Sequence, residues 1–168
     1  MPDVILKGKA FKFGDNISTD LIIPGKYAQL RSNLPELAKH VMEDADQTFA
    51  DRVKPGDFII AGRNFGLGSS REHAPLVIKM SGVSAILAKS VARIFFRNAI
   101  NQGLPVLICG TDKIDTGDEI EVNLTTGVVT DLTNGIQLTF SRIPQVMLDI
   151  LAEGGLIPYI SKYGDFKL

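Results

Sequence analysis

Three short apolar runs separated by segments with helical spacing constrain the fold of this chain more than any other feature. The runs cover residues 58–61, 83–88 and 105–109, and none contains a charged residue. Continuous apolar strands are typical of a sheet that is covered on both faces. Residues 69–80 and 90–101 lie between the runs and have the spacing of helices, and the second is expected to direct a stripe of Val91, Ile94, Phe95 and Ile100 into the core. The alternation predicts a parallel α/β sheet with right-handed crossovers.

The flanking segments predict further elements around this core. Residues 4–13 alternate apolar and polar side chains, which predicts a half-buried first strand. Short helices are expected at residues 34–41 and 47–53. An antiparallel hairpin, one more strand and a helix are expected in the last third, at residues 119–123, 128–132, 136–140 and 144–153. The sequence predicts one α/β domain, residues 1–168, with a mainly parallel core sheet and an antiparallel addition.

The charge balance argues against several classes of partner. The chain has 18 Lys and Arg residues against 19 Asp and Glu, a formal net charge of -1. A near-neutral chain has no electrostatic reason to bind nucleic acid or an anionic membrane. The apolar runs are too short to span a bilayer, and residues 1–12 have the alternation of a strand rather than a signal peptide. We therefore expect a cytoplasmic protein.

The chain contains one cysteine, Cys109, and two histidines, His40 and His73. One cysteine cannot form an internal disulfide or hold a metal cluster alone, and these three residues do not form a zinc ligand set. We expect Cys109 to be a small buried apolar residue and expect no metal site in this chain. Any metal that the protein uses must come from elsewhere.

The most informative segment is a loop at residues 62–75, Gly-Arg-Asn-Phe-Gly-Leu-Gly-Ser-Ser-Arg-Glu-His-Ala-Pro. It follows a predicted strand and precedes a predicted helix, at the edge where open α/β sheets bind ligands. Its glycines let the backbone approach a ligand closely. Ser69 and Ser70 can cap the helix or offer hydroxyls, and Arg71 offers a planar fork suited to a carboxylate. The loop therefore suits an anion.

The loop matches none of three common motifs. A dinucleotide fingerprint needs a third glycine where this chain has Arg71, and a phosphate loop needs Gly-Lys-Ser/Thr. A nucleophile elbow needs Gly-x-Ser-x-Gly, which is absent from the sequence of the loop. An ordinary capped helix with polar surface residues stays open as an alternative at this point.

The longer string resembles the signature of a known family. Residues 64–75 are similar to the signature of the small subunits of isopropylmalate isomerase and homoaconitase, and to the fourth domain of aconitase. The resemblance continues, in the same order, through residues 15–20, 23–25, 82–86, 89–98 and 101–105. It thus covers most of the chain.

The resemblance implies a swivelling three-layer β/β/α domain that is inactive alone and is completed by a large iron–sulfur subunit. In such enzymes a [4Fe–4S] cluster is held by cysteines of the large subunit and acts as a Lewis acid on a departing hydroxyl. The reaction is the loss and re-addition of water across a small hydroxy-diacid. The implied activity is that of a hydro-lyase.

The resemblance also assigns site residues. Ser69 corresponds to the serine that acts as base, and its alkoxide needs strong local stabilisation. Arg71 corresponds to the arginine that binds a substrate carboxylate, and Ser70 is expected to assist it. Asp20 corresponds to an acidic residue of the active-site region, with a loop-capping role as the alternative. Arg31 is a candidate second carboxylate clamp, with a solvated arginine as the alternative.

Four other residues near the signature are left outside the predicted site. Glu72 and His73 are expected to fix the start of the helix, where a glutamate suits the helix dipole. Arg93 and Arg97 lie one turn apart and could serve packing, an interface or the site.

The substrate is expected to depend on the loop after Pro24-Gly25. Relatives often have Tyr-Leu-Arg-Thr there, whereas in this chain Leu-Arg is displaced by two residues, and Leu67 replaces a common cysteine. The predicted specificity loop consists of Lys26, Tyr27, Ala28 and Leu30. Its apolar members favour a branched malate over a third carboxylate.

The implied substrates are therefore 3-isopropylmalate and 2-isopropylmalate, intermediates of leucine biosynthesis. Dimethylmalate, citramalate and homoaconitate stay open as alternative substrates. A non-catalytic carboxylate-binding module and a scaffold protein stay open as alternative functions.

Overall fold

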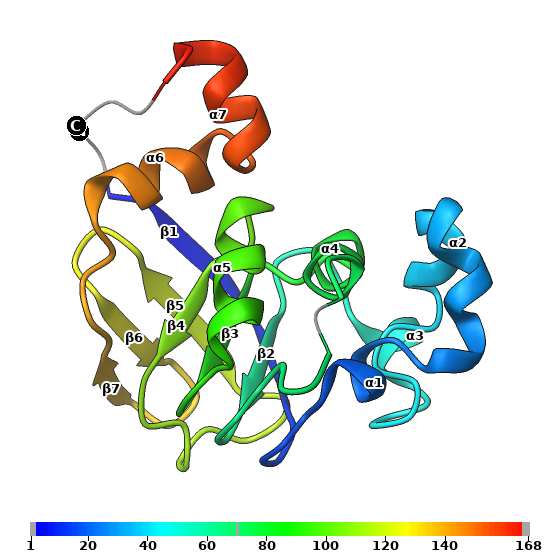
Figure 1. Cartoon of the computed structure of the whole chain (residues 1–168). Helices are drawn as coiled ribbons and strands as arrows, with labels where there is room; N and C mark the ends of the chain where they lie inside the picture. Colours follow the sequence, from blue (N-terminus) through cyan, green and yellow to red (C-terminus); the bar gives the residue numbers. More distant parts are fainter. Residues whose placement is uncertain (1–2, 70, 166–168) are drawn as a thin grey trace.

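The computed structural model describes residues 3–69 and 71–165. Within these residues the strands form one seven-stranded sheet, in the order β4-β3-β2-β1-β5-β6-β7 (Figure 1). The parallel strands are β1 (Ile5–Lys12), β2 (Phe58–Ala61), β3 (Ala85–Ala88) and β4 (Val106–Ile108). The antiparallel strands are β5 (Glu119–Asn123), β6 (Val128–Asp131) and β7 (Ile136–Thr139). The predicted parallel core with an antiparallel addition is confirmed.

The sheet buries two separate hydrophobic cores because side chains alternate along each strand. On β2, Ile59 faces the helices, whereas Phe58 and Ile60 face the opposite core. That opposite core also contains Val122 of β5 and Val129 of β6. The antiparallel strands therefore fold back over the parallel ones, and the layers are β/β/α as expected.

Helices cover the other face of the parallel strands (Figure 1). They are α1 (Thr19–Ile22), the 3-10 helix η1 (Gly25–Ser32), α2 (Leu34–Ala38), α3 (Phe49–Arg52), α4 (His73–Met80) and α5 (Arg93–Asn101), whereas α6 (Gln145–Ala152) and α7 (Leu156–Tyr163) pack against α5. Figure 1 shows α1, α2 and α3 as a lobe beside α4, with α6 and α7 at the far end of the molecule. Within the described ranges, every helix is too short or too polar to cross a bilayer.

The helix that the sequence places from Ser69 begins at His73 instead. Gly66 and Gly68 have φ angles of 78° and 104°, so the chain leaves β2 in a conformation that is not helical. The carbonyl of Ser69 then accepts a hydrogen bond from the Thr19 hydroxyl at 3.0 Å. These constraints hold Ser69 in the loop, and it cannot cap α4.

One other helical prediction is wrong. Ile94 was expected in the core stripe of α5 but is 54% exposed. Because α5 directs Phe95 and Ile100 into the core, Ile94 lies about 100° around the helix from Phe95 and points aside. The helix predicted at residues 144–153 is confirmed as α6 and ends before Gly154, whereas α7, which follows it and buries Tyr159 completely, was not predicted from the sequence.

Candidate functional site

The loop after β2 is held between two neighbouring segments. Ser18 and Leu67 form a parallel bridge on one side, and Phe65 and Val91 form another on the other side. The Thr19 amide donates to the Leu67 carbonyl at 2.9 Å, within the first of these pairings. Parallel pairing thus continues past the ends of β1, β2 and β3 and fixes the backbone of the loop.

Unusual backbone conformations shape this loop. Gly66 packs so closely on α5 that a Cβ atom would lie 2.3 Å from the ring of Phe95. Asn64 and Asn16 both have a φ of 58°, which asparagine tolerates better than most residues. The Asn64 side-chain amide donates to Oδ1 of the Asn16 side chain at 3.0 Å, and the Asn64 backbone amide donates to the Ser90 hydroxyl at 2.8 Å. Several contacts with neighbouring segments therefore fix the backbone conformation of this turn.

Ser69 lies at the exposed end of this loop. It lines a hollow of about 230 Å³ together with Gly68, Arg71 and Ile94. Its carbonyl is held by the hydroxyl of Thr19, whose side chain is buried. Sequence reasoning missed Thr19, although it stands directly before Asp20. Its partner is 50 residues away, so no local pattern could reveal the contact.

Arg71 connects Ser69 with a second hollow. One terminal nitrogen of its guanidinium forms an ion pair with Asp20, and the other donates to the Ile23 carbonyl at 2.7 Å. The guanidinium has further N–H groups to offer a ligand. The second hollow measures about 340 Å³ and is lined by Ile23, Ala28, Arg31, Arg71, Glu72 and His73.

Two arginines therefore meet on one cavity. The Nε of Arg31 donates to the Ala28 carbonyl at 3.0 Å, which orients its guanidinium within η1. Arg31 and Arg71 provide planar forks for carboxylates, while Ile23 and Ala28 provide an apolar wall. The geometry suits a small dicarboxylate with an alkyl group. Glu72 and His73 also line this cavity, in addition to standing at the start of α4.

The predicted specificity loop is divided between cavity and core. Of its four residues, all of which are described, Ala28 lines the cavity. Tyr27 and Leu30 pack against the helix-side core, and Lys26 is exposed. Ser70 lies outside the described residues, so its assistance to Arg71 stays a prediction.

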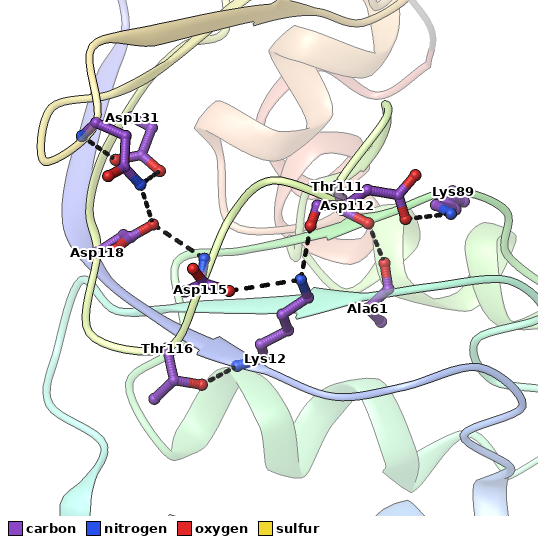
Figure 2. Close-up of polar contacts among 10 residues, drawn as sticks. Lys12, Ala61, Lys89, Thr111, Asp112, Asp115, Thr116, Asp118 and Asp131 are labelled. Atoms are coloured by element: carbon purple, nitrogen blue, oxygen red, sulfur yellow. Dashed lines mark hydrogen bonds and ion pairs between the residues drawn. The ribbon is translucent and has the colours of Figure 1, made fainter.

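A second polar cluster lies at the same edge of the sheet, after β4 (Figure 2). The ammonium of Lys12 donates to the Asp112 carbonyl at 2.9 Å, and Lys89 pairs with the Asp112 carboxylate. The hydrogen bond from Lys89 lowers the pKa of that carboxyl. The buried Thr111 hydroxyl donates to the Ala61 carbonyl at 2.6 Å. These polar groups are partners of one another or of the backbone, so they hold the loop in place. We call the cluster of Lys12, Lys89, Thr111 and Asp112 the brace.

The described residues do not fit an iron–sulfur cluster. Among them, no group of three or more His, Cys, Asp or Glu side chains converges as metal ligands. Burial raises the pKa of the Cys109 thiol to about 11, which disfavours the thiolate that binds iron. A cluster at this site would need ligands from another chain.

Known proteins resemble this chain in sequence and in structure. Residues 23–109 match the family model described as the aconitase C-terminal domain. The 3-isopropylmalate dehydratase small subunit 2 of Archaeoglobus fulgidus is 65% identical over 96% of this chain and 98% of its own length. The isopropylmalate/citramalate isomerase small subunit of Methanocaldococcus jannaschii is 51% identical over 94% and 95%, respectively. A crystal structure of 3-isopropylmalate dehydratase from Methanocaldococcus jannaschii has a TM-score of 0.90 at 46% identity, over 96% of both chains.

Proposed function

Since the chain belongs to the family of 3-isopropylmalate dehydratase small subunits, we propose that it interconverts 3-isopropylmalate and 2-isopropylmalate as part of a hydro-lyase. The observation that carries this substrate is the cavity shared by Arg31 and Arg71. Two guanidinium groups match the two carboxylates of a malate. Ile23 and Ala28 offer apolar contact to a branched alkyl group. The reaction belongs to leucine biosynthesis.

Ser69 is the proposed base. It would take the carbon-bound proton of the hydroxy-diacid on its hydroxyl oxygen and return a proton when water adds back. An alkoxide is costly in water, so it needs positive charge nearby. Arg71 lines the same hollow as Ser69 and would supply that charge, while Asp20 orients its guanidinium.

A larger partner is the second part of the proposal. The relatives are named small subunits, and Ser69 and Asp20 are both exposed. Another surface must cover them if water is to be kept from the reacting atoms. Because the described residues do not fit a [4Fe–4S] cluster, we assign the cluster to the partner. The whole chain, residues 1–168, would then act as one swivelling domain.

The proposal is tested by hydrating unsaturated diacids with this chain alone and with a cluster-loaded large subunit. We expect activity in the mixture, with isopropylmaleate preferred over the methyl analogue citraconate. Preference for citraconate would favour citramalate as substrate, the second activity named for the 51% identical relative. No activity in any mixture with an intact cluster would contradict the proposal and favour a carboxylate-binding module.

Replacing Arg31 tests the two-carboxylate cavity directly. Arg31→Ala removes one fork, so we expect KM for the diacid to rise about 30-fold, as for the loss of a charge-assisted hydrogen bond. Arg142→Ala is the matched control, because Arg142 is exposed and lies in the segment after β7, away from this cavity. An unchanged KM for Arg31→Ala would remove Arg31 from the site.

A further inference from the structure

Behind the cavity, three side chains form a cluster that the predicted site does not include. The rings of Tyr27 and His40 are stacked, with centroids 3.8 Å apart and planes 16° from parallel. Nδ1 of His40 lies 3.3 Å from Oε2 of Glu43. This oxygen is buried and accepts no well-aligned hydrogen bond from the described residues. The Tyr27 hydroxyl interacts with the Glu43 carboxylate and lowers the pKa of that carboxyl.

The cluster is attached to the segment that lines the cavity. Tyr27 belongs to η1, in which residues three apart lie on the same face. Ala28 and Arg31 therefore share the face toward the cavity, and Tyr27 and Leu30 share the face toward the core. Every residue of η1 is described, and none of them is fully buried. The position of η1 therefore depends on a few anchors, of which Tyr27 is one.

Glu43 is fixed relative to the catalytic side of the molecule. It follows Met42, which is fully buried with a φ of 59°, an unfavourable conformation for a residue other than glycine. The Met42 amide donates to the Ile22 carbonyl at 2.9 Å, and Arg71 holds the next carbonyl, that of Ile23. Glu43 and Arg71 are thus both tied to α1 and to the residue that follows it.

We propose that Glu43 and His40 are positioning residues that set the alkyl end of the cavity by holding Tyr27. This inference rests on the proposed function, because it concerns how the same cavity selects its substrate. Glu43 contacts the imidazole of His40, and that imidazole stacks on the ring of Tyr27, so η1 presents Ala28 and Arg31 at a fixed depth. The hydrogen bond from Tyr27 lowers the pKa of Glu43 and raises that of Tyr27, as a charge-assisted contact should.

Glu43→Gln and Tyr27→Phe test the inference in the complex with the large subunit. Gln preserves the size of Glu but removes the charge, and Phe preserves the stacking but removes the hydroxyl. We expect each variant to change the ratio of kcat/KM for isopropylmaleate to that for citraconate about tenfold. The change should arise mainly in KM for the larger diacid. The double variant should be no worse than either single one, because both disturb the same contact between Tyr27 and Glu43.

Glu36→Gln is the matched control. It makes the same chemical change on α2, where the carboxylate forms an exposed pair with Lys39 at 3.0 Å. This variant should leave the ratio unchanged. If Glu43→Gln and Tyr27→Phe leave the ratio unchanged, or lower both activities equally, the inference is overturned.

A second readout does not require activity. Amide hydrogen exchange in Gly25–Ser32 should accelerate in Glu43→Gln relative to Glu36→Gln, while exchange in β3 stays the same. Unchanged exchange in η1 would overturn the inference by itself. If the wild-type complex hydrates neither diacid, the proposed function fails, and the exchange experiment still decides whether Glu43 positions η1.

Discussion

The loops after β2 and β4 leave the same edge of the parallel sheet but use their polar side chains in opposite ways. In the loop after β4, Thr111 bonds to Ala61 at the end of β2, and Asp112 pairs with Lys89, which directly follows β3 (Figure 2). In the loop after β2, the neighbours hold the backbone, and Ser69 and Arg71 line open hollows. The loop for which we propose a catalytic role therefore combines a backbone with many partners and side chains that can still bind a ligand.

The largest expected effect comes from Ser69→Ala. The variant should lose at least about 1000-fold in kcat, the loss expected for a general base. Its free energy of unfolding should stay within about 0.5 kcal/mol of wild type, because the side chain is exposed. Turnover in the complex and urea unfolding of the chain measure the two effects. Ser161→Ala, on the exposed face of α7, is the control, and near-wild-type turnover by Ser69→Ala would end the role of Ser69.

Arg71→Lys should have the next largest effect. Lysine keeps the charge but lacks the planar fork that reaches both Asp20 and the Ile23 carbonyl. We expect kcat/KM to fall about 100-fold, or about 2.7 kcal/mol. The opposite exchange in the brace, Lys89→Arg, should leave kcat/KM unchanged. Equal losses in the two variants would mean that both loops serve catalysis.

Two buried threonines allow a matched test of the two loops. Thr19 donates to the Ser69 carbonyl at 3.0 Å, and Thr111 donates to the Ala61 carbonyl at 2.6 Å. Thr→Val at either position should cost about 1 kcal/mol of unfolding free energy, since each loses one hydrogen bond. We expect only Thr19→Val to lower kcat, by about tenfold, because it releases the backbone of Ser69. A similar loss of kcat in Thr111→Val would contradict the proposed difference between the loops after β2 and β4.

The smallest expected effect is a pH dependence of the free energy of unfolding, caused by Asp131 at the end of β6. Asp131 is buried, and burial together with the neighbouring Asp118 raises its pKa above the ordinary value. Protonation of Asp131 therefore stabilises the folded chain. That contribution is complete below the unfolded-state pKa near 3.8 and is lost as the pH rises through the folded-state value.

Asp131→Asn removes this titration. Relative to wild type, the variant should become more stable as the pH is raised from about 4 to 7, as measured by urea unfolding at several pH values. Asp149→Asn is the control on α6, outside the carboxyl pair. A constant difference between Asp131→Asn and wild type across this range would contradict the raised pKa. Neither variant should change the substrate ratio.

Local patterns predicted much of the fold. The bounds of β2 match the apolar run 58–61, because a strand buried on both faces must be apolar throughout. The start of α4 was misplaced because Thr19, far away in the sequence, holds the Ser69 carbonyl. The helical pattern continued through Ser69, whereas the tertiary contact did not allow it.

Some residues of the candidate site could likewise be predicted from local sequence, whereas others depend on tertiary contacts. Ser69 and Arg71 stand in one contiguous motif, so the sequence could indicate them together. Thr19 contacts Ser69 and Glu43 contacts Tyr27 only because the fold brings them together. No sequence motif contains either pair, so the sequence could not indicate these contacts. Tyr27 was predicted to face the substrate, but its position in a 3-10 helix turns it toward the core.

The lack of any fully buried residue in η1 has a consequence for how such proteins diverge. An insertion there disturbs little packing, and lengthening a surface segment costs only about 0.6 kcal/mol per doubling of its length. The two-residue displacement of Leu-Arg in this chain is of that inexpensive kind. In contrast, the loop with Gly66 accepts no side chain against Phe95. The chain can therefore change in η1 at little cost to stability, whereas the loop after β2 has little room for change.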